Sequence, residues 1–239
     1  MAKRKRKLSD GRSVAVQSRP RKSIKKRRAH PAAPANASIY SVHPGIVMIQ
    51  KWIGDLKVKT GRTLDEWLSH IKAAGPTTEK DCRDWLMNAY QLGTNAAGWL
   101  ADKALRNGKQ SADDTPKGYL SQAPVYVEQM YAGSKALLRP IHDKLISLAR
   151  QLGDDVRICP CKTIVPLYRR HVFAQIKPAT SKRIELGFAL GEEPFTSRLR
   201  DTGGRARKDR ITHSVAVTSL DDIDLQIKRW LKEAYQRDA

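Results

Sequence analysis

Cysteine is scarce in this chain, whose 239 residues include only Cys82, Cys159 and Cys161. So small and odd a number does not supply the disulfide framework of a secreted domain, and it favours a reducing intracellular compartment. The chain also lacks any apolar run near the roughly 18 residues that cross a bilayer. No apolar segment follows its charged start, as it would in a secretory signal. We therefore expect a soluble cytoplasmic protein with no membrane partner.

Recognised catalytic motifs are missing as well. The sequence has no G-x-x-x-x-G-K-[ST] phosphate loop, no H-E-x-x-H zinc pair and no G-x-S-x-G nucleophile elbow. The glycines of T-G-G-R-A-R-K, residues 202–208, lie between predicted strands, which favours a flexible hairpin over an anion-cradling loop. No nucleophile and base stand out. The sequence leans against an enzyme, leaves an unrecognised activity open and calls for no cofactor.

Basic residues outnumber acidic residues in this chain, most strongly in its first 30 residues. The formal net charge is +21, and residues 1–30 hold 13 Lys and Arg against one acid, Asp10. Residues 31–115 hold ten basic residues against nine acidic ones, and residues 116–239 hold 22 against 14. More than half of the excess charge therefore lies in the first eighth of the chain, and the C-terminal part is moderately basic.

Residues 1–40 are predicted to be a disordered basic tail and linker, because so polar a segment cannot bury enough apolar surface to offset its ordering entropy. Such a tail would contact the phosphates of DNA or RNA in a salt-dependent way. The alternatives are a solvated tail that aids solubility and a nuclear localisation signal. The candidate contact residues are Lys3, Arg4, Lys5, Arg6, Lys7, Lys25, Lys26, Arg27 and Arg28.

Residues 41–108 are predicted to form a small four-helix domain. Apolar residues recur at helical spacing, Gly61 closes the first helix, and Thr63 with Glu66 forms a capping box for the second. The later helix boundaries are predicted at Thr77 or Thr78, at Gly93, at Thr94 or Asn95, and near Gly108.

Tryptophan is concentrated in this helical region, which contains Trp52, Trp67, Trp85 and Trp99. These rings could stack on nucleobases, but aromatic residues at helical spacing more often form a core. The turn L-G-T-N-A-A-G-W is similar to a helix-turn-helix joint, yet the nearly neutral charge argues against insertion into a DNA groove. We interpret the region as structural.

Residues 109–122 are predicted to be a polar linker and residues 123–239 an α+β domain. An amphipathic helix is expected from Leu138 to Leu152, followed by β-type runs. A closing helix is expected after Ser219 or the aspartates that follow it. The fold class is thus α+β, with a small four-helix N-terminal domain and a C-terminal antiparallel sheet flanked by helices.

Cys159 and Cys161 in C-P-C-K are the nearest approach to a metal motif, and His171 or His213 could complete a site for a soft metal. The spacing differs from the usual C-x-x-C, and residues two apart on a strand do not converge on one ion. We therefore favour two small apolar strand residues over metal ligands.

Basic side chains on successive predicted strands suggest an anion site. If Lys162, Arg169 and Arg183 share a face of the sheet, with His213 on the last strand, they form a concave cationic surface for a phosphate or carboxylate. The ordinary alternative is solvated strand faces whose basic groups pair with acids such as Asp155.

His213 begins the last predicted strand, T-H-S-V-A-V-T. Val215 and Val217 point to the same face of that strand as His213, since residues two apart share a face. These apolar neighbours favour a buried, hydrogen-bonded imidazole over a ligand contact.

Two stretches resemble known families. The segment K-T-G-R-T-L-D-E-W-L, with the later G-P and L-G-T-N-A-A, resembles a short helical domain of unknown function found in many bacterial proteins. Residues 120–236, with R-P-I-H-D-K-L and T-H-S-V-A-V-T-S-L-D-D-I-D, resemble a second uncharacterised family that is sometimes labelled transport-protein-like. The two families are often fused in this order. The resemblance implies a bacterial cytosolic protein with this order of folds, and it supplies no reaction.

Two functions remain open. The first is a non-enzymatic protein that binds nucleic acid or another polyanion through its basic tail and basic sheet. The second is a module that binds a small anionic ligand or a metal at the C-terminal sheet.

Overall fold

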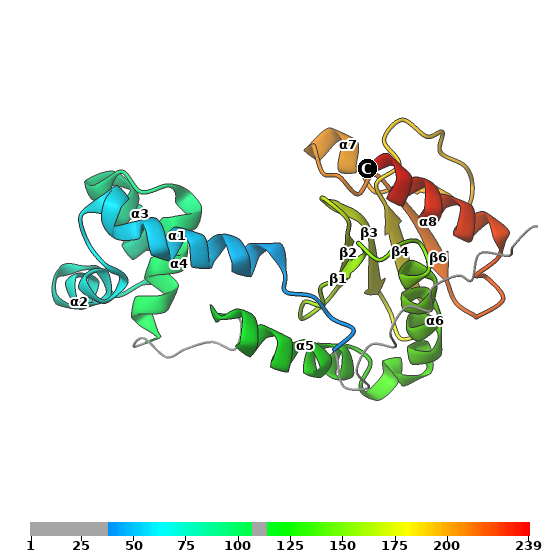
Figure 1. Cartoon of the computed structure of the whole chain (residues 1–239), viewed down its shortest axis with the longest axis horizontal. Helices are drawn as coiled ribbons and strands as arrows, with labels where there is room; N and C mark the ends of the chain where they lie inside the picture. The colour runs from blue at the N-terminus through cyan, green and yellow to red at the C-terminus, as the bar shows by residue number, and fades with distance from the viewer. Residues whose placement is uncertain (1–37, 107–113) are drawn as a thin grey trace, which may run out of the picture. The chain divides into compact units, whose positions relative to one another are not determined.

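The computed structural model describes residues 38–106 and 114–239 (Figure 1). Residues 1–37 of the predicted basic tail and linker, with the contact residues Lys3–Lys7 and Lys25–Arg28, lie outside the described residues.

Helices α1 and α2 begin and end where local sequence signals place them. Helix α1, Pro44–Thr60, starts where His43 Nδ1 accepts the Gly45 backbone N–H, and it ends at Gly61, whose φ of 78° suits a residue without a side chain. Helix α2, Leu64–Ala74, starts at the predicted capping box, in which Thr63 and Glu66 satisfy each other's backbone N–H groups.

Helix α3 ends earlier than predicted, whereas helix α4 begins at a predicted residue. Helix α3, Glu79–Tyr90, is capped by Thr78 but ends at Gln91, which adopts the left-handed conformation, rather than at Gly93. Helix α4, Thr94–Leu105, begins at Thr94 as predicted, with Gly93 as its N-cap and no side-chain capping hydrogen bond.

The four helices share one core, in which Leu56, Leu86 and Leu100 are fully buried. Trp67 lies in this core and donates its indole N–H to Thr60 Oγ1 at 2.8 Å. The other three tryptophans of these helices, Trp52, Trp85 and Trp99, are partly buried and pack against the core.

Helix α5, Pro116–Met130, occupies much of the segment where the sequence predicted a polar linker to residue 122. Thr115 accepts the Gly118 N–H and Pro116 takes the first helical position, which is a standard helix start. The polar composition of the segment conceals this signal. The apolar residues Tyr119, Ala123, Tyr126 and Val127 form a buried stripe on the helix.

The C-terminal region is built on one sheet of six short strands, in the order β1-β2-β3-β4-β6-β5, with every pair antiparallel. The strands are β1 Arg157–Ile158, β2 Val165–Tyr168, β3 Val172–Pro178, β4 Ile184–Phe188, β5 Arg200–Asp201 and β6 His213–Val217.

Two helices cover one face of this sheet (Figure 1). Helix α6, Arg139–Arg150, follows the 3-10 helix η2, Gly133–Leu138, and helix α8, Leu225–Arg237, is capped by Asp224. Their apolar stripes join the inward side chains of the strands in one core. This core contains Leu145, Ile176, Leu186, Val215 and Trp230.

Intervening strand residues point to the opposite face of the sheet. Gln175, Lys177, Glu185 and Ser214 alternate with the core residues and are half-buried or exposed. The long polar loop predicted between strands contains β5 and a short helix, α7 Gly204–Arg207, in place of the expected flexible hairpin.

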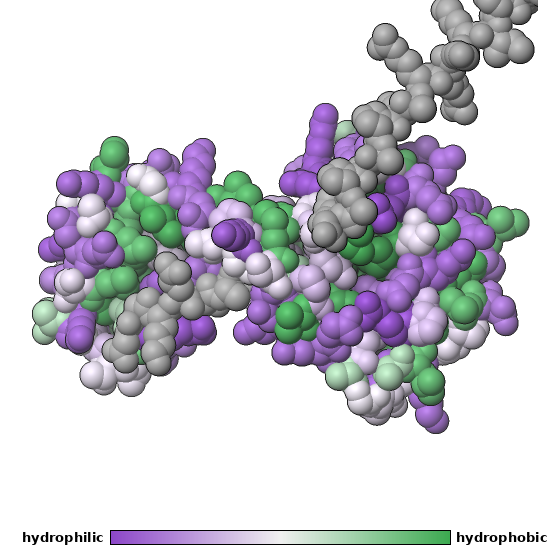
Figure 2. All heavy atoms as spheres, turned by 60° about the horizontal axis from the view of Figure 1, so that its bottom comes forward, coloured by the Kyte–Doolittle hydropathy of each residue, from purple (hydrophilic) through white to green (hydrophobic). Residues whose placement is uncertain are grey.

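The predicted α+β fold class is confirmed, since the described residues combine helices with an antiparallel sheet near the C-terminus. Among the described helices, none is long and apolar enough to cross a membrane. Hydrophilic residues cover much of the face in Figure 2, with scattered hydrophobic ones between them.

We expect the stability of the core between the sheet and helices α6 and α8 to depend on pH through His142. The residue lies on α6, is 1% exposed, and places Nδ1 3.1 Å from the Tyr131 hydroxyl. Burial lowers the pKa of His142 from 6.5 to about 4. An unfolded histidine binds a proton in that interval while the folded one does not, so stability is lost as pH falls from 6.5 towards 4.

We expect the free energy of unfolding to decrease by up to about 1.4 kcal/mol per pH unit in this window. Denaturant unfolding at several pH values measures the slope. His142→Asn keeps a hydrogen-bond acceptor for Tyr131 without a titrating ring, so the variant should have a shallower slope. An unchanged slope would contradict this assignment.

Candidate anion-binding site

The sheet separates the four predicted anion-site residues into two pairs. Val165 pairs with Ile176 and Ile184 pairs with Pro178, so the loops that carry Lys162 and Arg183 lie at one end of the sheet. Phe188 pairs with His213, at the opposite end. Arg169 follows β2 at that opposite end as well. The four side chains therefore do not meet in one site.

Arg169 is paired with an acid. Its Nε lies 2.7 Å from Asp155 Oδ2, and its guanidinium lies over the Tyr235 ring, 4.4 Å from the centroid. Hydrogen bonds from the Tyr235 hydroxyl and from Arg169 lower the pKa of Asp155. Arg169 thus ties the β2–β3 turn to α8, as in the alternative interpretation of the sequence.

Arg183 is also paired. Its Nε lies 2.9 Å from Glu185 Oε1, and Arg200 donates to the same carboxylate at 3.0 Å. Glu185 is thereby shared between two arginines. Lys177 lies opposite Glu185 in the β3–β4 pairing, but the Glu185 carboxylate is already paired with these two arginines.

His213 is fully buried, as its apolar neighbours on the strand suggest. Its Nε2 lies 2.9 Å from the Glu193 carbonyl oxygen and its Nδ1 2.7 Å from Thr212 Oγ1. The carbonyl can only accept, so Nε2 carries the proton and Nδ1 accepts from the threonine hydroxyl. Burial lowers the pKa of His213, although the bond to Glu193 acts in the opposite direction. Both ring nitrogens therefore serve the fold.

The two strand cysteines are surrounded by backbone rather than by metal ligands. Cys159 is fully buried, and burial raises the pKa of its thiol to about 12. Its Sγ lies 3.8 Å from the Val42 carbonyl oxygen, and Cys161 Sγ lies 3.8 Å from the Cys159 carbonyl oxygen. His171 instead pairs with Asp238 at 2.9 Å. Within the described residues, no three His, Cys, Asp or Glu side chains gather as metal ligands.

Lys162 contributes to a different cationic site. Three lysines, Lys135, Lys162 and Lys177, line one hollow of about 450 Å³ at the end of the sheet, which we call the lysine hollow. They come from η2, from the β1–β2 loop and from β3. Lys135 Nζ donates to the Pro178 carbonyl at 2.8 Å, which joins η2 to the end of β3.

The polar groups of the lysine hollow suit an anion. Gln129, Ser134 and Thr163 add an amide and two hydroxyls to its lining. In the part of the chain that the structure describes, no carboxylate forms an ion pair with Lys162 or Lys177. Glu185, the acid opposite Lys177, is already held by Arg183 and Arg200. The hollow therefore collects positive charge without local neutralisation.

Sequence reasoning found part of this site. Lys162 was predicted as an anion contact, and Lys177 belongs to the basic residues of the predicted strands, but Lys135 was missed. Lys135 lies 27 residues before Lys162, on a 3-10 helix. A prediction of the lysine hollow would have required the register of the sheet and the path of the chain after α5.

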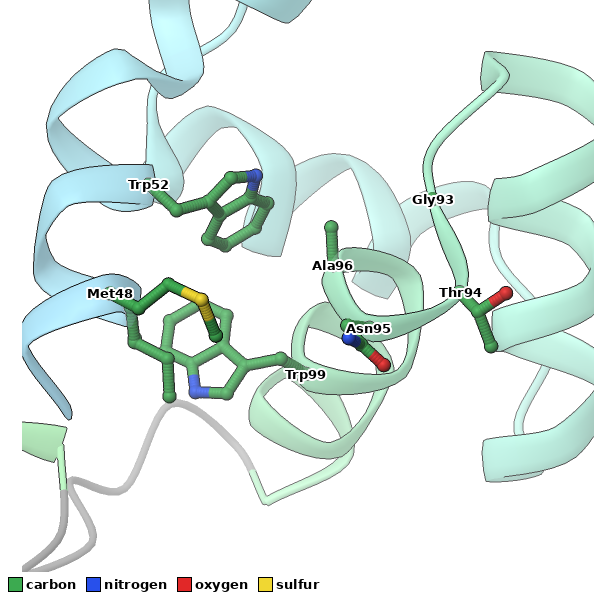
Figure 3. Close-up of a pocket in the computed structure, with 8 residues that line it drawn as sticks. Met48, Trp52, Gly93, Thr94, Asn95, Ala96 and Trp99 are labelled. Atoms are coloured by element: carbon green, nitrogen blue, oxygen red, sulfur yellow. The ribbon is translucent and has the colours of Figure 1, made fainter. Parts of the chain in front are cut away.

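A second, apolar hollow of about 660 Å³ lies between α1 and α4 (Figure 3). Trp52 and Trp99 meet edge to face there, with ring centroids 5.4 Å apart, and Met48 lies beside Trp99. The lining carries no charged side chain. It therefore offers nothing to balance the charge of a phosphate.

Comparison with models of protein families gives a match in the C-terminal region. Residues 127–238 match the model of a domain of unknown function, DUF5655. The DUF5655 region includes all six strands, α6 and α8, and the whole lysine hollow. The match does not extend to residues 41–108, so the family resemblance of that part stays a prediction. No curated protein and no solved structure matches the chain.

Replacing His213 separates its structural role from ligand binding. In His213→Phe the buried Thr212 hydroxyl loses its acceptor at Nδ1, while the Glu193 carbonyl loses one of two donors and keeps Arg205. We therefore expect a loss of about 1–3 kcal/mol in the free energy of unfolding. Denaturant titration measures it. Affinity for polyanions should stay unchanged where the variant is folded, and a selective loss of affinity would assign His213 to a ligand site.

Proposed function

We propose that this protein binds nucleic acid, and that the lysine hollow of the DUF5655 region holds phosphate groups of its backbone. The single observation that carries the proposal is the convergence of Lys135, Lys162 and Lys177 on one hollow, with no carboxylate paired to Lys162 or Lys177 among the described residues. The role is one of binding, without catalysis.

Electrostatics favours an anion in this hollow. Three ammonium groups around one space repel one another, and their repulsion is relieved when a negatively charged group enters. Ammonium groups, hydroxyls and an amide all donate hydrogen bonds, and phosphate oxygens accept them. A phosphate would therefore find both charge balance and hydrogen-bond donors.

The charge distribution favours a long polyanion. Residues 1–30 carry 13 basic residues against one acidic residue, far more than one small ligand needs. Such a segment would contact several phosphates of a strand whose neighbouring phosphate lies in the lysine hollow. The scarcity of cysteine suits a cytoplasmic setting for this complex.

A small phosphorylated ligand is the second candidate. The hollow is concave, and its volume of about 450 Å³ falls within the range of small-molecule sites. A thermal shift with inorganic pyrophosphate, measured on the chain with and without residues 1–35, distinguishes this ligand from a polymer.

Charge reversal in the hollow tests the proposed function. We expect Lys162→Glu with Lys177→Glu to weaken binding of full-length protein to oligonucleotides by at least about tenfold near 50 mM salt, because phosphate contacts with Lys dominate such affinity. The log of the binding constant should also fall less steeply with the log of salt concentration. Fluorescence anisotropy measures both quantities.

The matched control is Lys228→Glu with Lys232→Glu on α8, which changes the net charge of the protein equally at two exposed positions. This control should lose less affinity than the hollow variant. Equal losses would mean that only overall charge matters and would sink the proposed site. A chain without residues 1–35 should bind more weakly but keep the difference between the two variants.

A further inference from the structure

Another hollow, distinct from the apolar one between α1 and α4, shares a wall with the lysine hollow. It has a volume of about 370 Å³, and Lys162 and Thr163 of the β1–β2 loop line both spaces. On its other sides lie His43, Tyr119 and Tyr126, with Pro160 and Cys161 of the same loop. We call it the aromatic hollow.

Hydrogen bonds hold the walls of the aromatic hollow in place. Tyr119 on α5 donates its hydroxyl to the Pro160 carbonyl at 2.8 Å, which fixes the β1–β2 loop against the helix. His43 accepts the Gly45 N–H at Nδ1, so its Nε2 carries the proton and donates to Tyr168 Oη at 3.2 Å. The rings of Tyr119 and His43 are therefore held in place before any ligand arrives, which lowers the entropic cost of binding.

The chemistry of the two hollows differs across their shared wall. The lysine hollow offers ammonium groups and hydroxyls, whereas the aromatic hollow is lined mainly by flat rings and apolar carbon. A nucleotide has the same division, with a charged phosphate on one side of the sugar and a flat base on the other. Aromatic side chains with basic residues nearby are the usual platform for unpaired bases. Tyr119 and Tyr126 are 2% and 6% exposed, so a base in the hollow would contact only the small part of each ring that borders it.

The need for an unpaired base distinguishes between forms of nucleic acid. In a duplex each base is stacked and paired, and it reaches a protein hollow only after costly extrusion. A single strand can turn its bases outwards without that cost.

We infer that the nucleic acid is single-stranded, with a phosphate in the lysine hollow and the adjoining base in the aromatic hollow beside Tyr119 and Tyr126. This inference rests on the function proposed above. It adds a base subsite to the phosphate contacts, and it places that subsite partly on residues that precede the DUF5655 region.

Cys161 reports on occupancy of the aromatic hollow. It is half-buried and lines the hollow, while Cys82 and Cys159, the only other cysteines, are 0% exposed. Alkylation of the native full-length protein by iodoacetamide, followed by mass spectrometry of the Cys161 peptide, therefore measures access to this wall.

Three probes separate the base from the phosphate: oligothymidylate of about 15 nucleotides, a duplex of the same length and inorganic polyphosphate. At saturation, oligothymidylate should slow Cys161 alkylation at least about fivefold, while polyphosphate and duplex leave the rate nearly unchanged. Equal protection by all three, or no protection by bound oligothymidylate, would overturn the inference alone. If none of the three binds, the proposed function fails as well.

A pair of variants tests the hollow by a second route. Cys161→Leu fills space in the aromatic hollow, while Cys161→Ser keeps it open and replaces the thiol donor with a hydroxyl donor. We expect the leucine variant to lose at least about fivefold in affinity for oligothymidylate, the lower end of what one stacked base contributes, and to keep its affinity for polyphosphate. The serine variant should lose less affinity for oligothymidylate than the leucine variant, because it adds no bulk to the hollow. Native oligothymidylate affinity in a folded leucine variant would contradict the base subsite.

Discussion

Because neighbouring residues of a strand point to opposite faces, the antiparallel pairing of β3 with β4 assigns every side chain on them to one of two environments. Ile176 and Leu186 face the core beneath α8, whereas Lys177 and Glu185 face outwards. The same pairing fixes which loops meet at each end of the sheet. A shift of the register by one residue would bury Lys177 and expose Ile176. The lysine hollow therefore depends on this register.

Ion pairing then decides which basic side chains remain available. The arginines of the C-terminal region are largely engaged, as Arg169 is with Asp155 and Arg183 is with Glu185. A guanidinium presents a planar fork that suits a carboxylate, and it is less strongly hydrated than an ammonium group. The lysines keep their charge towards solvent. The division between structural arginines and available lysines is a property of the fold that composition alone does not reveal.

Local signals in the sequence predicted local structure well. The capping box of Thr63 and Glu66 gave the start of α2, and the apolar spacing gave the helices that cover the sheet. Helix α5 was missed because its polar start resembled a linker, although Thr115 and Pro116 carried a start signal. Properties that depend on distant residues were harder to predict. The separation of Lys162 from Arg169 and His213 follows from strand register, and the place of Lys135 follows from the path of the chain after α5.

Lys162 and Thr163 form the wall that the lysine hollow shares with the aromatic hollow, so they separate a cationic space from a mainly apolar one. A change in either side chain alters both spaces at once, so the charge of one and the shape of the other cannot be varied separately at these positions. Separate changes in the charge of one space and the shape of the other would have to come from the outer walls, through Lys177 on one side and Tyr126 on the other. In a set of related sequences, the shared wall should therefore change less freely than the walls that face away from it.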